Sequence, residues 1–348
     1  MDLSTFNSIA LAGLFAFILL NMTGLLGGNR MPVEGKTVLI TGGSEGLGLA
    51  AAKKLAAKGA NIILVSRSVD KLQNALQTLK TAARNPRTQR FHYISADVSI
   101  PSYAAPVIRE AITWNNGRAP DIVWCVAGTS VPQLFLDMEM SSMRRQMDIN
   151  YFGTADMSHA ILKEWLSPDS PVENQQPRHL VMTTSAVIFY PIPGYTPYTP
   201  SKFAIRGLAE SLSREVMLYP QDVRVHMVCP GTILSPGFEQ EQLVKPDITK
   251  KLEQSDPRQT PEEVAEACIR GLEKGEFLIT VNLLNWVMKL GCLGSAIRNN
   301  AIVDGIVAAL MMLIVWPIVN IDYHGQIRRW AKKHGHPATW TTPTTNKP

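Results

Sequence analysis

The sequence predicts an α/β fold in which a doubly wound parallel sheet is flanked by apolar membrane segments at both ends of the chain. Short runs rich in Val and Ile alternate with helical patterns from Gly35 to Val281, which is the element order of a parallel sheet covered on both faces. A glycine-rich turn follows the first run, and long apolar stretches lie before and after the alternating region. No internal repeat is evident, so we expect one large domain with appended segments.

Six runs are predicted to be buried strands, because they are short and apolar and are separated by helical patterns. They are Lys36–Thr41, Asn61–Ser66, Phe91–Ser95, Asp121–Ala127, Arg178–Thr184 and Val223–Cys229. Among the intervening stretches, Leu47–Lys58 and Leu72–Ala83 have the spacing of amphipathic helices.

Composition indicates a folded chain with a basic end. Hydrophobic residues make up 45% of the 348 residues and charged residues 18%, so the chain can bury a core. The net charge is +5, and beyond Ile321 the basic residues Arg328, Arg329, Lys332, Lys333 and Lys347 accompany only one acid, Asp322. A basic tail beside an apolar run favours anionic lipid headgroups as a partner and argues against nucleic acid.

The cysteines do not predict a metal site or a disulfide framework. Cys125, Cys229, Cys268 and Cys292 are not paired at metal-ligand spacing, and the chain is long for a disulfide scaffold. We therefore expect a reducing compartment for the α/β domain.

The sequence divides into four parts. Residues 1–30 are predicted to be an N-terminal membrane segment, 31–281 the α/β domain, 282–320 membrane-associated segments and 321–348 a basic tail. The apolar run Ser8–Leu26 would span about 28 Å as a helix. A cleaved signal peptide is the alternative, but Arg30 and Lys36 follow the run instead of preceding it. That order favours a span with the domain on the cytoplasmic side.

The C-terminal apolar region is harder to interpret. Ile302–Val319 is apolar except for Asp304, and a weaker stretch, Leu283–Leu293, precedes it and includes Lys289. A buried core helix is one interpretation, and a span or a shallow hairpin is the other. A hairpin would keep the basic tail on the same side as the domain, as the positive-inside tendency requires.

The turn Thr41–Gly48 has the features of a nucleotide-binding site. It follows the first predicted strand and opens the first helix, where free backbone N–H groups and the helix dipole attract a pyrophosphate. The residues expected to hold the nucleotide are Gly42, Ser44, Glu45, Gly46 and Gly48. A plain turn is the alternative for any glycine-rich stretch, but the strand–turn–helix context favours a nucleotide.

The end of the second strand favours NADPH over NADH. Sites for NAD usually place an acid here for the ribose 2′-hydroxyl, and the sequence Ser66-Arg67-Ser68 has none. Arg67, with Lys71 nearby, offers positive charge for a 2′-phosphate, although Glu45 adds a negative charge in the same region. Asp97, after the third strand, could accept a hydrogen bond from the adenine amino group or cap a helix.

Tyr198 and Lys202 form the predicted catalytic pair. Four residues apart on a helix, they share one face. A nearby ammonium stabilises a phenolate, so we expect Lys202 to lower the pKa of Tyr198 and enable it to exchange a proton with a carbonyl oxygen. Pro200 lies between them and is compatible with a helix if it occupies the first turn.

Two further polar residues complete the predicted site. Ser185 follows the fifth strand and could polarise the same carbonyl, although Thr183 and Thr184 precede it and leave Thr184 as an alternative. Asn150 follows the helical stretch Ser141–Ile149 and could hold a water next to the lysine.

Together these motifs resemble those of the short-chain dehydrogenase/reductase family. The glycine turn, Ala127-Gly128, Asn150, Ser185, the Tyr198–Lys202 pair and Pro230-Gly231 all occur in the order of that family, over about Gly35 to Val281. The resemblance implies a Rossmann-type sheet with the active site at the carboxyl ends of its strands. It also implies that Lys202 binds the nicotinamide ribose and that Ile233 holds the carboxamide through its backbone.

A narrower resemblance suggests the substrate. The stretches Ile40–Gly48, Tyr198–Leu208 and Lys245-Pro246-Asp247, with apolar segments at both ends, are similar to members that reduce a long-chain keto-amine lipid at the endoplasmic reticulum membrane, facing the cytoplasm. Leu234–Asp256 is long for a connection and is predicted to cover the substrate as a lid.

Two other functions are compatible with the sequence. One is a reductase or dehydrogenase of another lipid, such as a steroid, a retinoid or an acyl ketone. The other is a membrane scaffold that binds a nucleotide without chemistry, which the intact Ser185, Tyr198 and Lys202 argue against. The sequence leaves the oligomeric state open, including a homo-oligomer.

Overall fold

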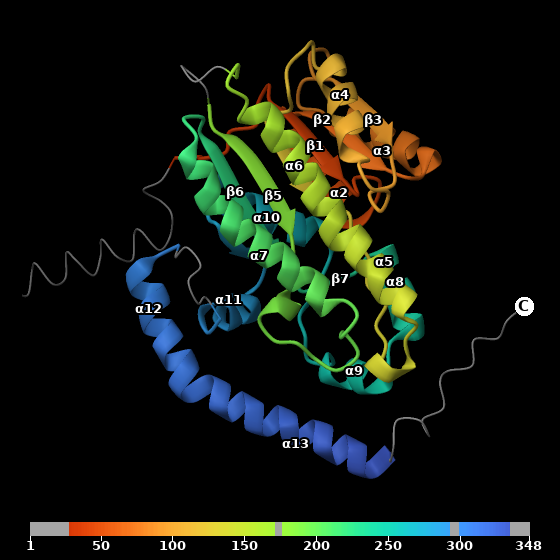
Figure 1. Ribbon diagram of the computed structural model, residues 1–348, viewed down its shortest axis with the longest axis vertical. Coiled ribbons are helices and arrows are strands. Elements are labelled where there is room, and N and C mark those ends of the chain that lie inside the picture. Colours follow the sequence, from red (N-terminus) through yellow and green to blue (C-terminus); the bar gives the residue numbers. More distant parts are fainter. Residues whose placement is uncertain (1–27, 171–175, 293–298, 335–348) are drawn as a thin grey trace, which may run out of the picture.

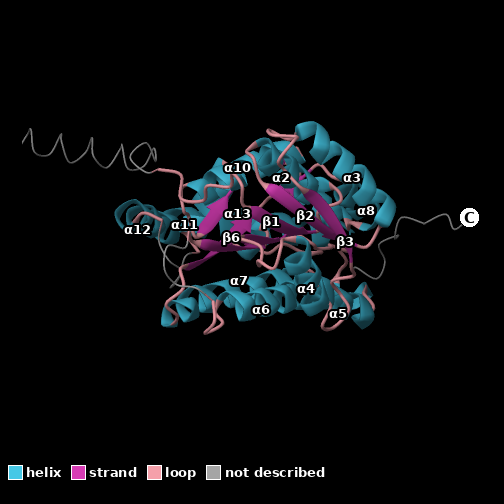
Figure 2. Cartoon of the chain, turned by 90° about the horizontal axis from the view of Figure 1, so that it is seen from above, coloured by secondary structure: helices cyan, strands magenta, loops and turns pink. Residues whose placement is uncertain are grey.

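A parallel sheet of seven strands runs through the centre of the protein, with helices on both faces (Figure 1, Figure 2). The computed structural model describes residues 28–170, 176–292 and 299–334, so the predicted membrane segment Ser8–Leu26 lies outside the described residues. The strand order is β3-β2-β1-β4-β5-β6-β9. Because the order reverses between β1 and β4, a crevice is expected there at the carboxyl ends of the strands.

The six predicted strands are confirmed, and β2, β3 and β6 match to the residue. The sheet contains β1 (Thr37–Thr41), β2 (Asn61–Ser66), β3 (Phe91–Ser95), β4 (Ile122–Cys125), β5 (Arg178–Thr183), β6 (Val223–Cys229) and β9 (Leu278–Thr280). All neighbouring pairs are parallel. The seventh strand, β9, is not among those predicted, because three residues are too few to show a period.

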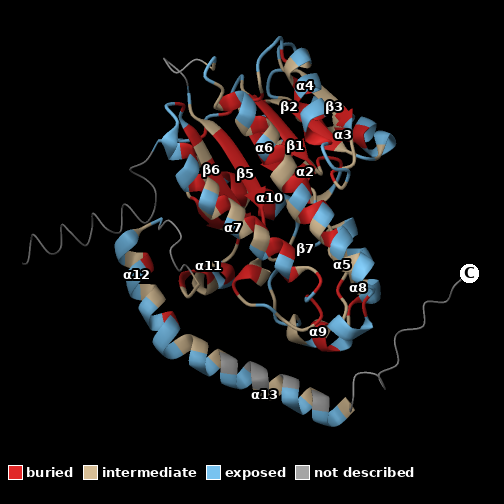
Figure 3. Ribbon diagram, in the orientation of Figure 1, coloured by how far each residue is buried: buried red, intermediate tan, exposed pale blue. Residues whose placement is uncertain are grey.

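Helices cover both faces of the sheet (Figure 2). One face carries α2 (Gly46–Ala57), α3 (Val69–Ala82) and α10 (Pro261–Glu273), and the other carries α4 (Ala104–Trp114), α6 (Gly153–Trp165) and α7 (Thr199–Glu215). The two predicted helices correspond to α2 and α3. Alternate residues of one strand face opposite layers: Val38 and Ile40 pack under α2 and α10, whereas Leu39 packs under the other layer. Figure 3 shows the strands as the most buried part of the molecule.

One helix of the second layer contains a wide turn. Helix α5 (Met140–Met147) continues into a π-helical turn, Asp148–Phe152, and then into α6 without a loop. Asn150 lies within this turn. Such turns are rare and occur often at functional sites.

The predicted lid is largely helical. It consists of α8 (Pro236–Val244) and α9 (Asp247–Leu252), between the short strands β7 (Thr232–Ile233) and β8 (Arg258–Gln259). Because β7 pairs with β8, the two ends of the lid are held together at its base. The Ser235 hydroxyl accepts a hydrogen bond from Phe238 N–H (3.3 Å) and caps the start of α8.

The C-terminal region begins with α11 (Leu283–Leu290), which packs against β9. Asn285 and Lys289 of this helix are buried, so the stretch Leu283–Leu293 contains a short helix docked on the domain, and its contact with a membrane stays a prediction. Beyond it, α12 (Ala301–Leu310), a π-helical turn (Met311–Val315) and α13 (Trp316–His334) form one continuous helix.

Among the residues described, Ala301–Val319 is the one stretch long and apolar enough to cross a membrane. Its mean hydropathy is 2.4 and only 11% of it is buried, so it is not a core helix. Side chains nevertheless tie the continuous helix to the domain. Trp316 stacks on Tyr190 with ring centroids 5.4 Å apart, and Lys251 Nζ lies 5.2 Å from the Trp330 ring.

Candidate active site

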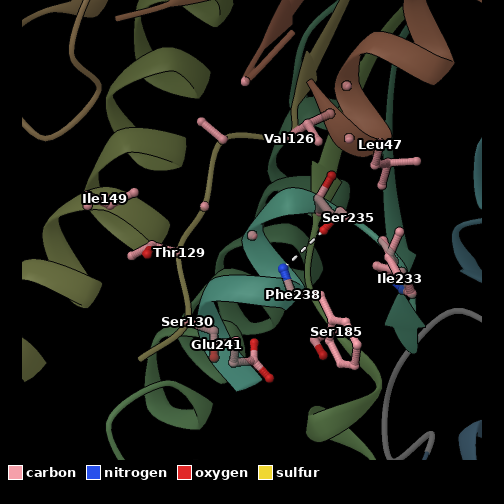
Figure 4. A pocket seen from close by; sticks show the side chains of 18 of the residues that line it. Leu47, Val126, Thr129, Ser130, Ile149, Ser185, Ile233, Ser235, Phe238 and Glu241 are labelled. Atoms are coloured by element: carbon pink, nitrogen blue, oxygen red, sulfur yellow. Dashed lines mark hydrogen bonds between the residues drawn. The ribbon is translucent and has the colours of Figure 1, made fainter. Parts of the chain in front are cut away.

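A cavity of about 730 Å³ opens at the carboxyl ends of the strands, between the glycine turn and the lid. Most of the predicted site residues line it: Gly42, Ser44, Glu45, Gly46, Gly48, Arg67, Asp97, Ser185, Tyr198, Lys202 and Ile233. Lys71 and Asn150 do not. Figure 4 shows the cavity from Val126 and Leu47 at one end to Ser185 and Glu241 at the other.

The glycine turn is shaped to receive a phosphate group. A Cβ on Gly42 would lie 2.7 Å from the backbone nitrogen of Ala127, and one on Gly48 would lie 2.1 Å from the Gly42 carbonyl oxygen. Gly46 has a φ of 55°, which disfavours other residues. Glu45, the N-cap of α2, makes no side-chain capping bond, so the first-turn N–H groups remain available to an anion. The turn therefore fits the pyrophosphate of a dinucleotide.

Charged residues surround the end of β2. Arg67 is 62% exposed, and its Nη1 lies 3.8 Å from Asp97 Oδ2. Lys71 Nζ lies 2.7 Å from Glu45 Oε2, so the negative charge that argued against NADPH has a cationic partner. At the end of β2, Arg67 thus lines the cavity and Lys71 does not, while Arg145 of α5 is a further cation in the lining.

Asp97 has a structural role in addition to the predicted one. Its Oδ1 accepts hydrogen bonds from the N–H (2.9 Å) and the hydroxyl (2.7 Å) of Ser99, which stabilises the turn after β3. Burial raises the pKa of the Asp97 carboxyl, but the bonds from Ser99, together with the charges of Arg67 and Arg145, outweigh it and hold the pKa below its usual value. Asp97 lines the cavity, and its contact with adenine stays a prediction.

Tyr198 lies at the start of α7, and Pro200 occupies the first turn as predicted. Burial raises the pKa of the Tyr198 phenol, the side-chain hydrogen bond with Ser185 lowers it, and Glu241 raises it further. The predicted fall under the influence of Lys202 is not found, because burial has the largest effect. The phenol is therefore protonated near neutral pH, as a proton donor must be, but its raised pKa makes release of the proton depend on nearby positive charge.

Lys202 lies one turn further along α7 and is 3% exposed. Its Nζ donates to the Thr183 carbonyl oxygen (3.1 Å) and lies 5.5 Å from the centroid of the Tyr198 ring. Burial lowers the pKa of Lys202 to about 8, so the ammonium is still the main form at neutral pH. A cation therefore stands beside the phenol, on the shared helix face that the spacing predicts.

The choice between Thr184 and Ser185 follows from their hydroxyl partners. Thr184 is buried, and its Oγ1 donates to the Val228 carbonyl oxygen (3.2 Å) and contacts Cys229 Sγ (3.0 Å). Ser185 instead bonds with Tyr198 and accepts from Val187 N–H (3.4 Å). The Ser185 hydroxyl is therefore the one placed to share a carbonyl oxygen with Tyr198.

Asn150 is buried, and its amide is engaged with protein. Its Oδ1 accepts from Thr129 N–H (2.8 Å), and its Nδ2 donates to the Thr129 carbonyl oxygen (3.0 Å) and to Ser201 Oγ (2.9 Å). A Cβ on Gly128 would lie 3.2 Å from Asn150 Oδ1 and 3.4 Å from Lys202 Nζ. Asn150 thus fixes the strand-end loop beside Lys202, and its role toward a water stays a prediction.

The lid and the loop before α7 contribute site residues that the sequence did not indicate. Tyr195, Glu241, Glu253 and Asp256 all line the cavity. The spacing of Glu241 and Lys245 is that of a helical ion pair, but ordinary surface pairs share this spacing. The position of Glu241 near Tyr198 depends on the folded lid and could not be predicted from this spacing.

Comparison with known proteins agrees with this arrangement. The sequence model of the short chain dehydrogenase family matches residues 36–244. Enzymes of this family use a nicotinamide cofactor, and the closely approached backbone of the glycine turn is suited to bind one. The chain is 51% identical over 314 residues to a 3-ketodihydrosphingosine reductase of Neurospora crassa, covering 89% of this chain and 86% of that one. It is 42% identical over 348 residues to a 3-ketodihydrosphingosine reductase of Aspergillus fumigatus, covering 95% and 94%.

Solved structures have the same fold. A short-chain dehydrogenase/reductase from Mycobacterium ulcerans superposes with a TM-score of 0.60 at 22% identity, over 72% of this chain and 90% of that one. The L-sorbose reductase of Gluconobacter frateurii, complexed with NADPH and L-sorbose, superposes with a TM-score of 0.59 at 21% identity, over 73% and 98%. With the family match over more than half of the sequence, these findings show that the chain belongs to the short chain dehydrogenase family of oxidoreductases.

Proposed function

We propose that this chain reduces the C3 ketone of 3-ketodihydrosphingosine to an alcohol with NADPH. The observation that carries the reaction type is the meeting of Ser185, Tyr198 and Lys202 in the cavity that also contains the glycine turn. The substrate is inferred from the two reductases at 51% and 42% identity, which cover most of the chain.

The side chains divide the reaction between them. The bound nicotinamide cofactor supplies the hydride that adds to the ketone carbon. Ser185 donates a hydrogen bond to the ketone oxygen and orients it, and Tyr198 gives its phenolic proton to the same oxygen as negative charge develops there. Lys202, a cation at neutral pH, stabilises the phenolate that remains. Tyr198 is protonated at neutral pH and so available as the donor, and the cation of Lys202 offsets the burial that makes the phenol harder to ionise.

The preference for NADPH rests on charge at the end of β2. Arg67 lines the cavity, and its guanidinium, which is 62% exposed and only loosely paired with Asp97 at 3.8 Å, can bind a 2′-phosphate in bidentate fashion. The turn Ser66-Arg67-Ser68 offers no acid to a ribose 2′-hydroxyl.

An assay with purified full-length chain in detergent tests the function. Oxidation of NADPH should depend on 3-ketodihydrosphingosine and yield the amino alcohol, identified by mass spectrometry. Steroid, retinoid and simple acyl ketones form the comparison panel. Faster turnover of any of them would replace the proposed substrate, and no turnover with any ketone would favour the scaffold alternative.

We also propose that the chain resides on the endoplasmic reticulum membrane with its domain in the cytoplasm. Apolar side chains of the continuous C-terminal helix support attachment, because Ile306 is 60% and Leu313 78% exposed. The basic residues Arg328, Arg329, Lys332 and Lys333 on the same helix suit anionic headgroups. Since Trp316 and Trp330 both contact the domain, we expect the helix to lie along the membrane surface with the tail on the cytoplasmic side.

A protease-protection experiment tests this orientation. A tag after Pro348 in sealed microsomes should be removed by added protease without detergent. A tag that survives until detergent is added would place the tail in the lumen and refute the proposal.

A further inference from the structure

The end of the cavity opposite the glycine turn is acidic. Glu241 of α8, with Glu253 and Asp256 after α9, lines it, and Figure 4 shows Glu241 at the same end as Ser185. Glu253 and Asp256 also line a side chamber of about 100 Å³ that shares Gly231 with the main cavity. Three carboxyl groups therefore face the space next to the reacting hydroxyls.

One cation only partly balances this charge. Lys245 is 1% exposed and does not line the cavity, but its Nζ contacts Glu241 Oε1 (2.7 Å) and Glu253 Oε2. Asp256 makes no side-chain hydrogen bond or ion pair with any residue that the structure describes. Burial, together with the nearby Glu253, raises the pKa of Asp256 to about 6, so Asp256 is still mostly ionised at neutral pH. Three carboxylates then face one ammonium, and the negative charge of the cluster is not balanced.

The acidic end lies close to the catalytic tyrosine. The Tyr195 hydroxyl donates to Glu241 Oε1 (2.5 Å), and the Tyr195 and Tyr198 rings have centroids 5.8 Å apart. The charge of Glu241 is also near enough to help raise the pKa of Tyr198. A positive group on the substrate, one or two bonds from its ketone, would therefore lie within the reach of these carboxylates.

A separate observation points to a polar ligand in the side chamber. Asn285 of α11 is 4% exposed, and its Nδ2 has no hydrogen-bond partner among the described residues. It lines the side chamber, and a Cβ on Gly231, in the wall between the two spaces, would lie 3.0 Å from this nitrogen. A buried donor without an acceptor costs about 1–3 kcal/mol, so the group is suited to an acceptor brought by a ligand.

We propose that Asp256, with the carboxylates of Glu241 and Glu253 behind it, binds the ammonium group of a 2-amino-3-ketone, and that Asn285 receives the neighbouring hydroxyl. This inference rests on the proposed function and extends it from the ketone to the polar head of the substrate. It gives the lid a specificity role: a charged keto-amine gains an ionic contact that neutral steroids, retinoids and N-acylated lipids lack. Lys245 holds two of the carboxylates in place, and Asp256 supplies the free one.

Two ketones of equal chain length separate the head-group contact from the reaction itself. One is 3-ketodihydrosphingosine, and the other keeps its hydroxyl and ketone but lacks the amine. Both are assayed with NADPH and the full-length protein in the same detergent micelles. The Asp256→Asn variant keeps the shape of the side chain and removes its charge. The matched control is Asp247→Asn, which changes an exposed carboxylate of the same lid, in the first turn of α9.

A charge-assisted contact of ordinary strength predicts the size of the effect. Asp256→Asn should lower the preference for the amine-bearing ketone, measured as the ratio of the two kcat/KM values, by about 10- to 100-fold, mainly through KM. Asp247→Asn should leave that ratio within about twofold, as expected for an exposed pair. Equal losses on both ketones, or an unchanged ratio in Asp256→Asn, would overturn the head-group site while leaving the reductase function intact. Absence of wild-type activity on 3-ketodihydrosphingosine would instead overturn both.

Discussion

Replacing Arg67 with Ala tests how the protein selects its cofactor. Arg67 lines the cavity at the end of β2, and its partner Asp97 lies 3.8 Å away. The change removes the cation proposed to bind the 2′-phosphate, which NADH does not have. NADPH and NADH should therefore respond differently.

The structure sets the size of the effect. A charge-assisted contact contributes about 1.5–3 kcal/mol. Because Arg67 is 62% exposed and already faces Asp97, screening favours the lower end, about 1.5 kcal/mol, or about tenfold in affinity. The variant also leaves Asp97 unpaired near the phosphate, which adds repulsion. We expect KM for NADPH to rise about 10- to 30-fold, and KM for NADH to change by less than about threefold.

Steady-state kinetics with both cofactors at saturating ketone measure this difference. Raising the salt concentration should reduce the NADPH effect, since the Debye length falls below about 10 Å above 0.1 M. Lys80→Ala is the control, because Lys80 is an exposed cation in the last turn of α3. Equal increases in KM for the two cofactors would refute the assignment of Arg67 to the 2′-phosphate.

Three further predictions concern the reaction and the stability of the fold. Tyr198→Phe should lower kcat at least about 100-fold, because it removes the hydroxyl that donates the proton. NADPH binding, followed by fluorescence, should stay nearly unchanged. Retention of most activity would exclude Tyr198 as proton donor. Ser185→Ala should lower kcat by a similar factor, whereas Thr184→Ala should mainly lower the melting temperature, and the reverse pattern would show that the two hydroxyls were assigned wrongly. His179 and His226 share a buried hydrogen bond (2.9 Å), and burial lowers their pKa values to about 3 and about 4. Their contribution to stability is present above the unfolded pKa of about 6.5, and the free energy of unfolding should fall by up to about 1.4 kcal/mol per histidine for each pH unit below it. A melting temperature that stays constant between about pH 6.5 and 5 would contradict this.

Elements that depend mainly on residues close together in the chain could be predicted from the sequence. The strands β2 and β6 are apolar runs that are buried over most of their length, so composition marks their limits. The strand β3 lies at the edge of the sheet and is mostly half-buried, but its Phe, Tyr and Ile residues still mark it as a strand. The glycine turn is local in part, because a Cβ on Gly48 would meet the carbonyl oxygen of Gly42 in the same turn. The Tyr198–Lys202 spacing places both side chains on one helix face whatever surrounds them.

Other features depend on contacts between distant segments. Lys245 looks like a surface residue in a charged stretch, but folding of the lid buries it between two glutamates. The pKa of Tyr198 could not be predicted from its distance to Lys202 along the chain, because burial has the largest effect and Glu241, which is distant in the sequence, raises the pKa further. Leu283–Leu293 has the composition of a membrane segment, and only the contact of α11 with β9 shows where its buried Lys289 lies.

The wide turn around Asn150 allows the side chains of α5 and of α6 to face different directions although the two helices are continuous. In a regular α-helix each residue advances the direction of the side chain by about 100°, so the orientations of α5 and α6 would be locked together. The π-helical turn Asp148–Phe152 adds a residue to that count, and Asn150 can point to Thr129 while Met157 and Ile161 still point into the core. Removing one residue from this turn would straighten the backbone and rotate the whole of α6 by about 100°, turning its apolar stripe away from the sheet. The number of residues in this turn therefore matters to the packing of α6 as much as the identity of its apolar side chains.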